Sequence, residues 1–193
     1  MAAEPNRLLT PAEYLERERA GELKHEYVAG EVYAMVGASW PHNLIASATF
    51  LSLGRQLEGS GCTILPSDMR VKIAALNIYT YPDISIVCGK PELEDKEFDT
   101  LLNPTVIAEI LSPSTEGYDR GLKFQRYRLI PAFREYLLIA QDTLRVEHAV
   151  RQPDNSWSLA AYTAADDVIA LPAVGCTLAL ADVYRKVAFD AQE

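Results

Sequence analysis

Three residues of this chain have the types and the spacing that metal-dependent hydrolysis of a phosphodiester bond requires. Asp83 stands at the head of the apolar segment Ile84–Cys88, and Glu109 lies inside the apolar segment Val106–Leu111. A carboxylate that is buried beside a sheet is costly unless it is paired with a cation or binds a metal. If the two segments are neighbouring strands, the carboxylates converge on one point, where oxygen ligands favour Mg²⁺ or Mn²⁺ over zinc. Lys123 follows on a predicted helix and supplies a positive charge.

Each of these residues also has an ordinary structural explanation. Backbone donors or nearby arginines could satisfy Asp83 and Glu109. Lys123 could pair with Asp119, four residues before it, in a surface interaction worth about 0.3–0.5 kcal/mol. The three residues alone therefore predict a site without deciding its chemistry.

The segments around these residues form a longer ordered pattern. It consists of HEYVAGEVYAM at residues 25–35, His42 after Gly37-Ala38-Ser39, the pair Pro82-Asp83, and the stretch from Glu109 through Ser112-Pro113-Ser114-Thr115 and Asp119 to Lys123 and Tyr127. In this pattern the chain resembles the PD-(D/E)XK nuclease superfamily, and within it the Uma2 family (DUF820) of restriction-endonuclease-like proteins. The resemblance covers roughly residues 10–185, which is nearly the whole chain.

The resemblance implies one domain over residues 1–193 with an α/β (α+β) restriction-endonuclease-like fold, in which helices flank a central mixed β-sheet. It also implies a Mg²⁺- or Mn²⁺-dependent endonuclease that hydrolyses nucleic acid, with DNA as the expected substrate and a 5′-phosphate on the product. The implied site residues are the metal ligands Asp83, Glu109 and Glu31, the catalytic Lys123, and the accessory residues His42, Tyr127 and Glu26, of which Glu26 is an alternative to Glu31.

One position departs from the superfamily pattern. The superfamily carries a lysine two residues after the second carboxylate, and here that position is Leu111. Residues 109 and 111 of a strand lie on the same face, so a lysine at 111 would have been close to the metal. Because leucine has no charge, we expect Lys123 on the following helix to supply it.

The net charge of −9 argues against high-affinity, non-specific binding of nucleic acid, because that binding comes mainly from lysine and arginine contacts with phosphates. Arg120, Arg126 and Arg128 nevertheless lie close to Lys123 in the sequence. Part of this group could face one line of phosphates, so we expect these arginines to contact nucleic acid. The alternative is a solvated helix face.

Two other classes of function remain open. A chain that keeps the fold but has lost the chemistry, as Leu111 suggests, would be a nucleic-acid or protein binding module. An interaction protein with a basic partner would match the acidic composition. Carboxylate-dependent uptake of Mn²⁺ distinguishes the nuclease from the binding module. Since cutting both strands of a duplex generally takes two active sites, a nuclease of this kind is expected to be a homodimer.

The cysteines and the hydropathy bear on the compartment. Cys62, Cys88 and Cys176 are odd in number and far apart, and none forms a Cys-x-x-Cys pair, so we expect neither a disulfide framework nor a zinc site. No apolar segment approaches the ~18–20 residues of a transmembrane helix, and the first residues lack the apolar stretch of a signal peptide. The sequence therefore predicts a cytoplasmic protein without a membrane partner.

The elements that would position the site follow from periodicity and turn signals. Thr10-Pro11-Ala12-Glu13 predicts a capping box that opens a helix to about residue 20, and Gly30 predicts the tight turn of a hairpin. A second helix is expected at residues 41–57, and a third from a Thr115 cap to residue 130, before Pro131. Strands are expected at residues 24–28, 31–36, 62–66, 69–74, 84–88, 106–111, 135–140, 143–150 and 157–162, and a loop at 91–99.

Overall fold

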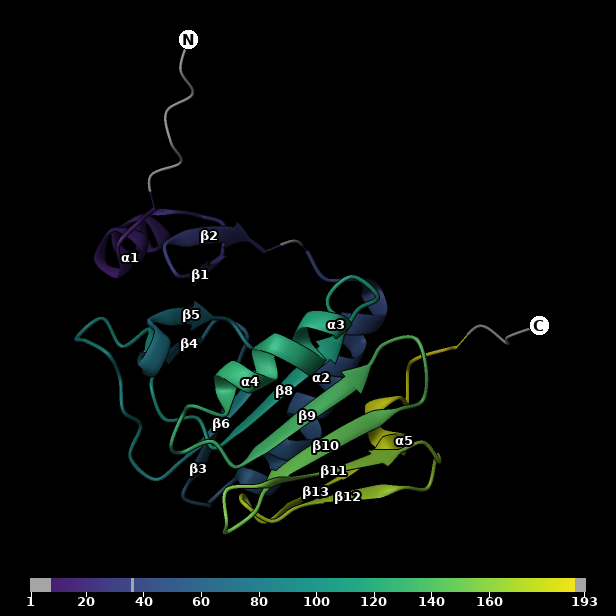
Figure 1. The fold of residues 1–193 in the computed structure, drawn as a ribbon. Helices are drawn as coiled ribbons and strands as arrows, with labels where there is room; N and C mark the ends of the chain where they lie inside the picture. Colours follow the sequence, from purple (N-terminus) through teal and green to yellow (C-terminus); the bar gives the residue numbers. More distant parts are fainter. Residues whose placement is uncertain (1–7, 36, 190–193) are drawn as a thin grey trace.

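A mixed β-sheet occupies the centre of the computed structural model, which describes residues 8–35 and 37–189 (Figure 1). Within the described residues its strand order is β11-β10-β9-β8-β6-β3. The strands are β3 (Cys62–Pro66), β6 (Ile84–Cys88), β8 (Val106–Leu111), β9 (Glu135–Ala140), β10 (Val146–Arg151) and β11 (Trp157–Tyr162). β8 and β9 run parallel, while the other neighbours are antiparallel. The prediction of a central mixed sheet is confirmed.

A second sheet, which the sequence did not predict as a separate unit, packs over one face of the first. Its order is β2-β1-β5-β4-β7 in the described residues. Its strands are β1 (His25–Val28), β2 (Glu31–Ala34), β4 (Arg70–Ile73), β5 (Ile78–Thr80) and β7 (Thr100–Leu101), with the 3-10 turn η1 (Ala74–Leu76) between β4 and β5. β5 and β7 were missed because such short strands have no readable periodicity.

The predicted hairpin is confirmed by the pairing of β1 with β2. Its turn places Ala29 at φ 51° and Gly30 at φ 97°, the left-handed conformation that two-residue hairpin turns need and that glycine adopts most readily. The second strand was expected to extend to residue 36. It ends at Ala34, and residue 36 lies outside the described residues.

The first two helices begin at, or within one residue of, their expected starts. In α1 (Pro11–Ala20) the Glu13 backbone N–H donates to Thr10 Oγ1 at 3.3 Å and the Glu13 carboxylate accepts from the Thr10 backbone N–H, so the capping box is confirmed. α2 (Trp40–Leu57) begins one residue earlier than expected, because Ser39 is its cap.

No helix of the described residues combines the length and the apolar character needed to cross a membrane.

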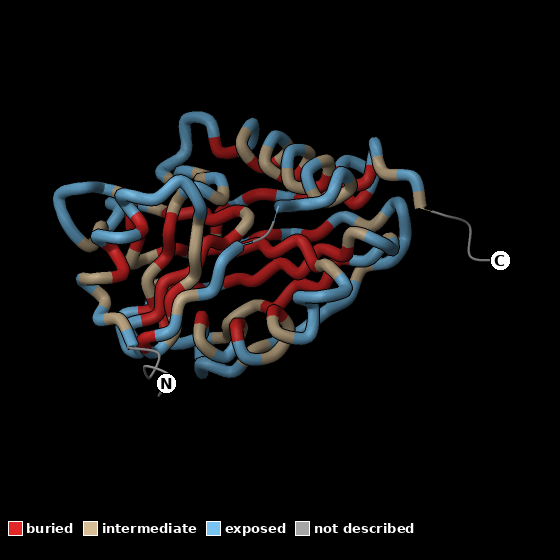
Figure 2. The backbone as a smooth tube through the Cα atoms, turned by 90° about the horizontal axis from the view of Figure 1, so that it is seen from above, coloured by how far each residue is buried: buried red, intermediate tan, exposed pale blue. Residues whose placement is uncertain are grey.

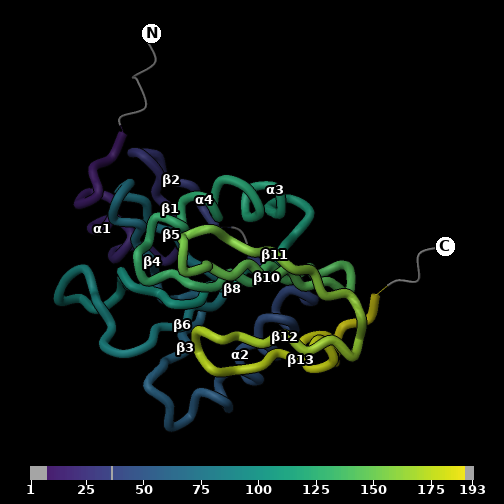
Figure 3. The backbone as a smooth tube through the Cα atoms, turned by 60° about the horizontal axis from the view of Figure 1, so that its bottom comes forward, coloured from purple at the N-terminus to yellow at the C-terminus, as the bar shows by residue number. Residues whose placement is uncertain are grey.

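The two faces of the central sheet have different covers. One face packs against α2, the hairpin of β12 (Val168–Leu171) and β13 (Cys176–Ala179), and α5 (Leu180–Val183), which lie beneath the sheet in Figure 3. The other face packs against the second sheet and the helical segment after β8. Figure 2 shows the buried backbone in the middle and exposed backbone around it. Along β8, Ile107 and Leu111 belong to the second of these cores, so Glu109 between them points to the same side.

The helix expected from residue 115 to residue 130 is divided and shorter. It consists of α3 (Glu116–Tyr118), the π-helical turn η2 (Asp119–Lys123) and α4 (Phe124–Tyr127). The expectation that the Thr115 side chain caps it is wrong: its hydroxyl contacts Ser112 instead, and no side-chain cap forms. π-Helical turns are rare and are frequently found at functional sites, so this segment is a candidate part of a functional site.

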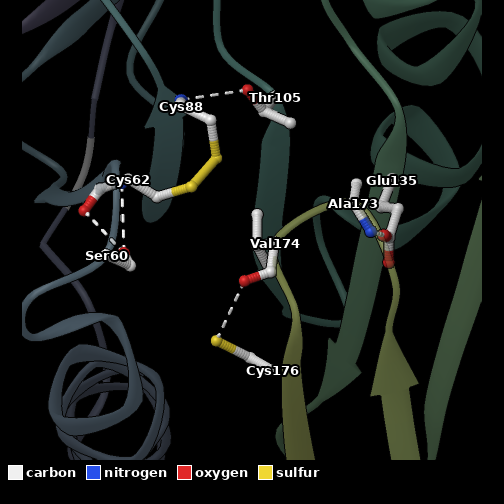
Figure 4. Close-up of a disulfide and its surroundings, with 8 residues drawn as sticks. All are labelled: Ser60, Cys62, Cys88, Thr105, Glu135, Ala173, Val174 and Cys176. Atoms are coloured by element: carbon white, nitrogen blue, oxygen red, sulfur yellow. Dashed lines mark hydrogen bonds between the residues drawn. A yellow bond between two sulfur atoms is a disulfide. The ribbon is translucent and has the colours of Figure 1, made fainter.

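The expectation that no disulfide forms is also wrong. Cys62 and Cys88 are direct partners on the antiparallel strands β3 and β6, with Cα atoms 3.9 Å apart, and their sulfur atoms are bonded (Figure 4). Twenty-six residues separate them in the sequence, and the strand register that brings them together cannot be read from that spacing. Cys176 is free and buried.

Candidate active site

Asp83 and Glu109 come from neighbouring strands, as the sequence predicts. Ile84 of β6 pairs with Ala108 of β8 in antiparallel register, which brings Asp83 opposite Glu109. Asp83 Oδ2 accepts a hydrogen bond of 2.7 Å from the Ile110 backbone N–H. The same oxygen lies 3.2 Å from Nε2 of His42, in the first turn of α2. The backbone and His42 therefore fix the Asp83 carboxylate.

Lys123 lies among three carboxylates. Its Nζ is 2.9 Å from Glu109 Oε1, 3.4 Å from Glu26 Oε1 and 3.4 Å from Asp119 Oδ1. Lys123 and Glu109 are 6% and 4% exposed, so this ion pair is shielded from water. The π-helical turn starts at Asp119 and ends at Lys123, and both of these residues are buried.

Tyr127 connects Glu109 to the second sheet. Its hydroxyl donates to Glu109 Oε1 at 2.9 Å and lies 3.0 Å from Thr80 Oγ1 of β5. Because the one hydroxyl proton of Tyr127 goes to Glu109, Thr80 is the donor in the second bond. Tyr127 is fully buried, so this chain of hydrogen bonds holds the carboxylate in one orientation.

The electrostatics of the buried pair are unusual. Burial raises the pKa of Glu109 to about 8; the nearby Lys123 opposes the rise, while the negative charges of Asp119 and Asp83 add to it. For Lys123, burial would lower the pKa, but Glu109, Glu26 and Asp119 hold it well above the ordinary lysine value. Lys123 is therefore a permanent positive charge at neutral pH.

The hairpin offers two glutamates, and the structure places Glu26 rather than Glu31 beside Lys123. Glu31 is exposed and accepts a hydrogen bond from the Tyr33 hydroxyl. Val28 pairs with Glu31 across the hairpin, so Glu26 and Glu31 share one face of it. The role of Glu31 as a metal ligand stays a prediction, with Glu26 in contact with the lysine.

Arg120 is engaged with acidic side chains of the protein. It forms ion pairs with Glu147 of β10, through Nη1, and with Glu116 at 3.5 Å. Glu147 also pairs with Arg145. A phosphate at Arg120 would therefore compete with these carboxylates.

Arg126 and Arg128 lie on the same helical segment but contact aromatic rings. Arg126 donates a 2.7 Å hydrogen bond to the Tyr118 hydroxyl. The guanidinium of Arg128 stands 5.8 Å from the Phe124 ring centre and 6.0 Å from that of Trp157. The three predicted arginines thus have different surroundings, and their contact with nucleic acid stays a prediction.

The donor chemistry at Asp83 and Glu109 fits a hard divalent ion. The contacts above occupy Asp83 Oδ2 and Glu109 Oε1, and the other oxygen of each carboxylate has no hydrogen-bond partner in residues 8–35 and 37–189. Mg²⁺ is commonly held by one or two carboxylates together with substrate phosphates and water. Within the described residues, no three His, Cys, Asp or Glu side chains lie close enough together to hold a metal ion.

Two members of the cluster were not predicted as site residues. Asp119 was considered only as a surface partner of Lys123, yet it is 4% exposed. Its spacing of four residues from Lys123 on a helix was the available signal. Thr80 gave no signal, because its role depends on how the second sheet packs against the helical segment.

Known proteins resemble this chain in sequence and in fold. The family model Uma2, described as "Putative restriction endonuclease", matches residues 11–181. Two uncharacterised proteins of Synechocystis sp. are similar in sequence: slr1290 is 35% identical over 94% of this chain and 94% of its own, and sll1609 is 38% identical over 82% and 90%. The crystal structure of a DUF820 "putative nuclease" from Anabaena variabilis has the same fold, with a TM-score of 0.74, 17% identity, and coverage of 92% of this chain and 98% of that one.

Proposed function

The chain belongs to the Uma2 family of restriction-endonuclease-like proteins, and from that premise we propose that it is a Mg²⁺- or Mn²⁺-dependent endonuclease whose substrate is DNA. The observation that carries the proposal is the 2.9 Å contact between Lys123 Nζ and Glu109 Oε1. This contact supports the idea that Lys123, on the helical segment, replaces the lysine that the superfamily carries at the position of Leu111.

Asp83 and Glu109 would hold the metal, with Glu26 or Glu31 as the third acidic group near it. When bound, the ion would polarise the scissile phosphate and lower the pKa of a water molecule. His42 keeps Asp83 Oδ2 in place at 3.2 Å, and Tyr127 does the same for Glu109 Oε1 at 2.9 Å. Both carboxylates are therefore oriented before substrate binds.

Lys123 acts as a fixed charge in this proposal. Because its pKa is held well above the ordinary lysine value, it does not serve as a general base at neutral pH. A buried ammonium close to the phosphate stabilises the negative charge that develops on the phosphoryl oxygens, the electrostatic effect that usually dominates such sites.

The remaining parts of the proposal concern partners and place. We propose a homodimer, because cleavage of both strands needs two sites, and contact of Arg120, Arg126 and Arg128 with the nucleic acid. We propose a cytoplasmic location, to be tested by fractionation of expressing cells. The Cys62–Cys88 disulfide stands against that location, since such bonds are rare in cytosolic proteins.

The test is a cleavage assay with a matched control. The parent protein is incubated with Mg²⁺ or Mn²⁺ and with single-stranded DNA, duplex DNA or RNA, beside Asp83→Asn and, as the control, Asp166→Asn, which changes an exposed aspartate outside the site. We expect cleavage by the parent and the control but not by Asp83→Asn. Absence of cleavage of every substrate, or equal cleavage by all three proteins, would refute the proposal.

A second candidate function is a catalytically inactive module that binds nucleic acid or protein. The observation that favours it is the position of Lys123 between three carboxylates, which neutralise its charge for an incoming phosphate. Such a module would bind Mn²⁺ no better than its Asp83→Asn variant, whereas the nuclease would lose Mn²⁺ affinity on that change.

A further inference from the structure

Helix α2 has an outer face without a partner in the described part of the chain. Its inner face is buried through Ile45, Leu53 and Leu57, which pack beneath the central sheet, where α2 lies behind the strands in Figure 1. On the outer face Trp40 is 75% exposed and Leu51 is 53% exposed. A helix of this length normally covers its solvent side with charged residues.

The charge of this helix differs from that of the whole protein. The chain has a net charge of −9, yet the sequence WPHNLIASATFLSLGRQL of α2 contains no Asp or Glu and only Arg55 as a permanently charged residue. Two copies of so acidic a protein repel each other over most of their surface. The outer face of α2 is the kind of surface on which two copies can meet without that repulsion.

The order of residues on this face is self-complementary for an antiparallel pair. Trp40, Leu44, Ser47 and Leu51 follow the 4-3-4 spacing of one helical face. A two-fold axis between Ser47 and Ala48 would bring Leu44 of one copy to Leu51 of the other. The same axis would bring Trp40 to Arg55, so that the one guanidinium of the helix would meet an exposed indole in a cation–π contact.

We propose that the outer face of α2 binds the same helix of a second copy of this chain, antiparallel and across a two-fold axis near Ser47. This inference rests on the homodimer of the proposed function but not on its chemistry. Nucleic acid is the less suitable occupant, because the face offers phosphates only Arg55. Stacking of a base on Trp40 would also not account for the exposure of Leu51, because Leu51 lies about 16 Å farther along the helix.

The pairing leaves the candidate active site free. His42 contacts Asp83 at the N-terminal end of α2, and its side chain is largely covered by the protein's own residues. Helix α2 has 18 residues and is therefore about 27 Å long. One helix face of that length buries on the order of 300 Å² per copy, less than the ~800 Å² of a standard interface, so self-association in the micromolar range is expected.

Sedimentation velocity between about 5 and 500 µM tests the proposal. We expect the parent to shift from monomer to dimer over this range, and Leu51→Glu to stay monomeric with an unchanged circular dichroism spectrum. The control is Leu23→Glu, which changes a 68% exposed leucine outside α2 and should dimerise like the parent. A parent that is monomeric throughout, or a Leu51→Glu variant that still dimerises, overturns the proposal.

A cross-linking experiment locates the axis independently. Ser47→Cys should form a disulfide-linked dimer on mild oxidation, because the two Ser47 positions lie next to the axis. Asn43→Cys, exposed on the same face, should not, because its two copies would be about 13 Å apart along the helices. The reverse result, or cross-linking of neither, contradicts this arrangement. Asp83→Asn should dimerise like the parent. Loss of cleavage in a variant that still dimerises therefore tests the proposed nuclease activity and not the proposed dimer.

Discussion

Replacing Glu109 by glutamine should change how the stability of the protein depends on pH. Burial raises the pKa of Glu109 from its ordinary 4.5 to about 8 in the folded protein. A carboxyl group with a raised pKa contributes stability that is fully present below the unfolded pKa and is lost as the pH rises through the folded pKa. Glutamine resembles the protonated carboxyl group but cannot ionise, so it avoids this loss.

The size of the effect follows from the pKa difference. Each pH unit between about 4.5 and 8 changes the relative stability by at most about 1.4 kcal/mol. We expect Glu109→Gln to gain about 2 to 3 kcal/mol relative to the parent between pH 5 and pH 8, with little further gain above that. The lower figure allows for relaxation of the buried pair with Lys123.

Urea unfolding in EDTA at each pH from 5 to 9 measures this difference, because the other titrating groups are common to both proteins and cancel. Glu58→Gln, at an exposed glutamate after α2, is the matched control and should show no trend. A flat difference for Glu109→Gln, or one in which the variant loses stability relative to the parent as the pH rises, would mean that Lys123 keeps Glu109 ionised. The reasoning about burial would then be refuted.

Three further predictions concern single contacts. Tyr127→Phe removes a buried hydroxyl with two partners and should lower the free energy of unfolding by about 1–3 kcal/mol; a loss below about 0.5 kcal/mol in urea would contradict the hydrogen-bond chain. Glu26→Gln should slow cleavage more than Glu31→Gln, because Glu26 is the one of the two glutamates that contacts Lys123. The opposite order in rate measurements would favour Glu31 as the ligand. Replacing both Cys62 and Cys88 by alanine should cost about 3–4 kcal/mol for a separation of 26 residues; a variant as stable as the oxidised parent in thermal unfolding would show that the bond contributes nothing.

The two strand carboxylates were predictable from local sequence. An acidic residue at the head of or inside an apolar run is a local conflict, and β6 and β8 have the predicted bounds. Tyr127 follows Lys123 by four residues, the spacing of one helix face, and both side chains contact Glu109. These features depend on residues that are close in sequence.

The features that sequence did not predict depend on contacts between distant segments. The choice between Glu26 and Glu31 follows from how the hairpin lies over the helical segment, because both point from the same face. The Cys62–Cys88 bond follows from the register of β3 with β6. The π-helical turn inserts an extra residue into a segment whose periodicity predicted an ordinary helix. None of these is a property of a short window of sequence.

The central claim is that Lys123 supplies the charge absent at Leu111, and single-turnover cleavage of a DNA oligonucleotide by Lys123→Met tests it most directly. The account predicts a rate about 10²–10³-fold below that of the parent, as expected for loss of one preorganised electrostatic group, with Lys123→Arg between the two. Binding of Mn²⁺, measured by calorimetry on the same samples, should persist. Cleavage by Lys123→Met at the parent rate would contradict the account.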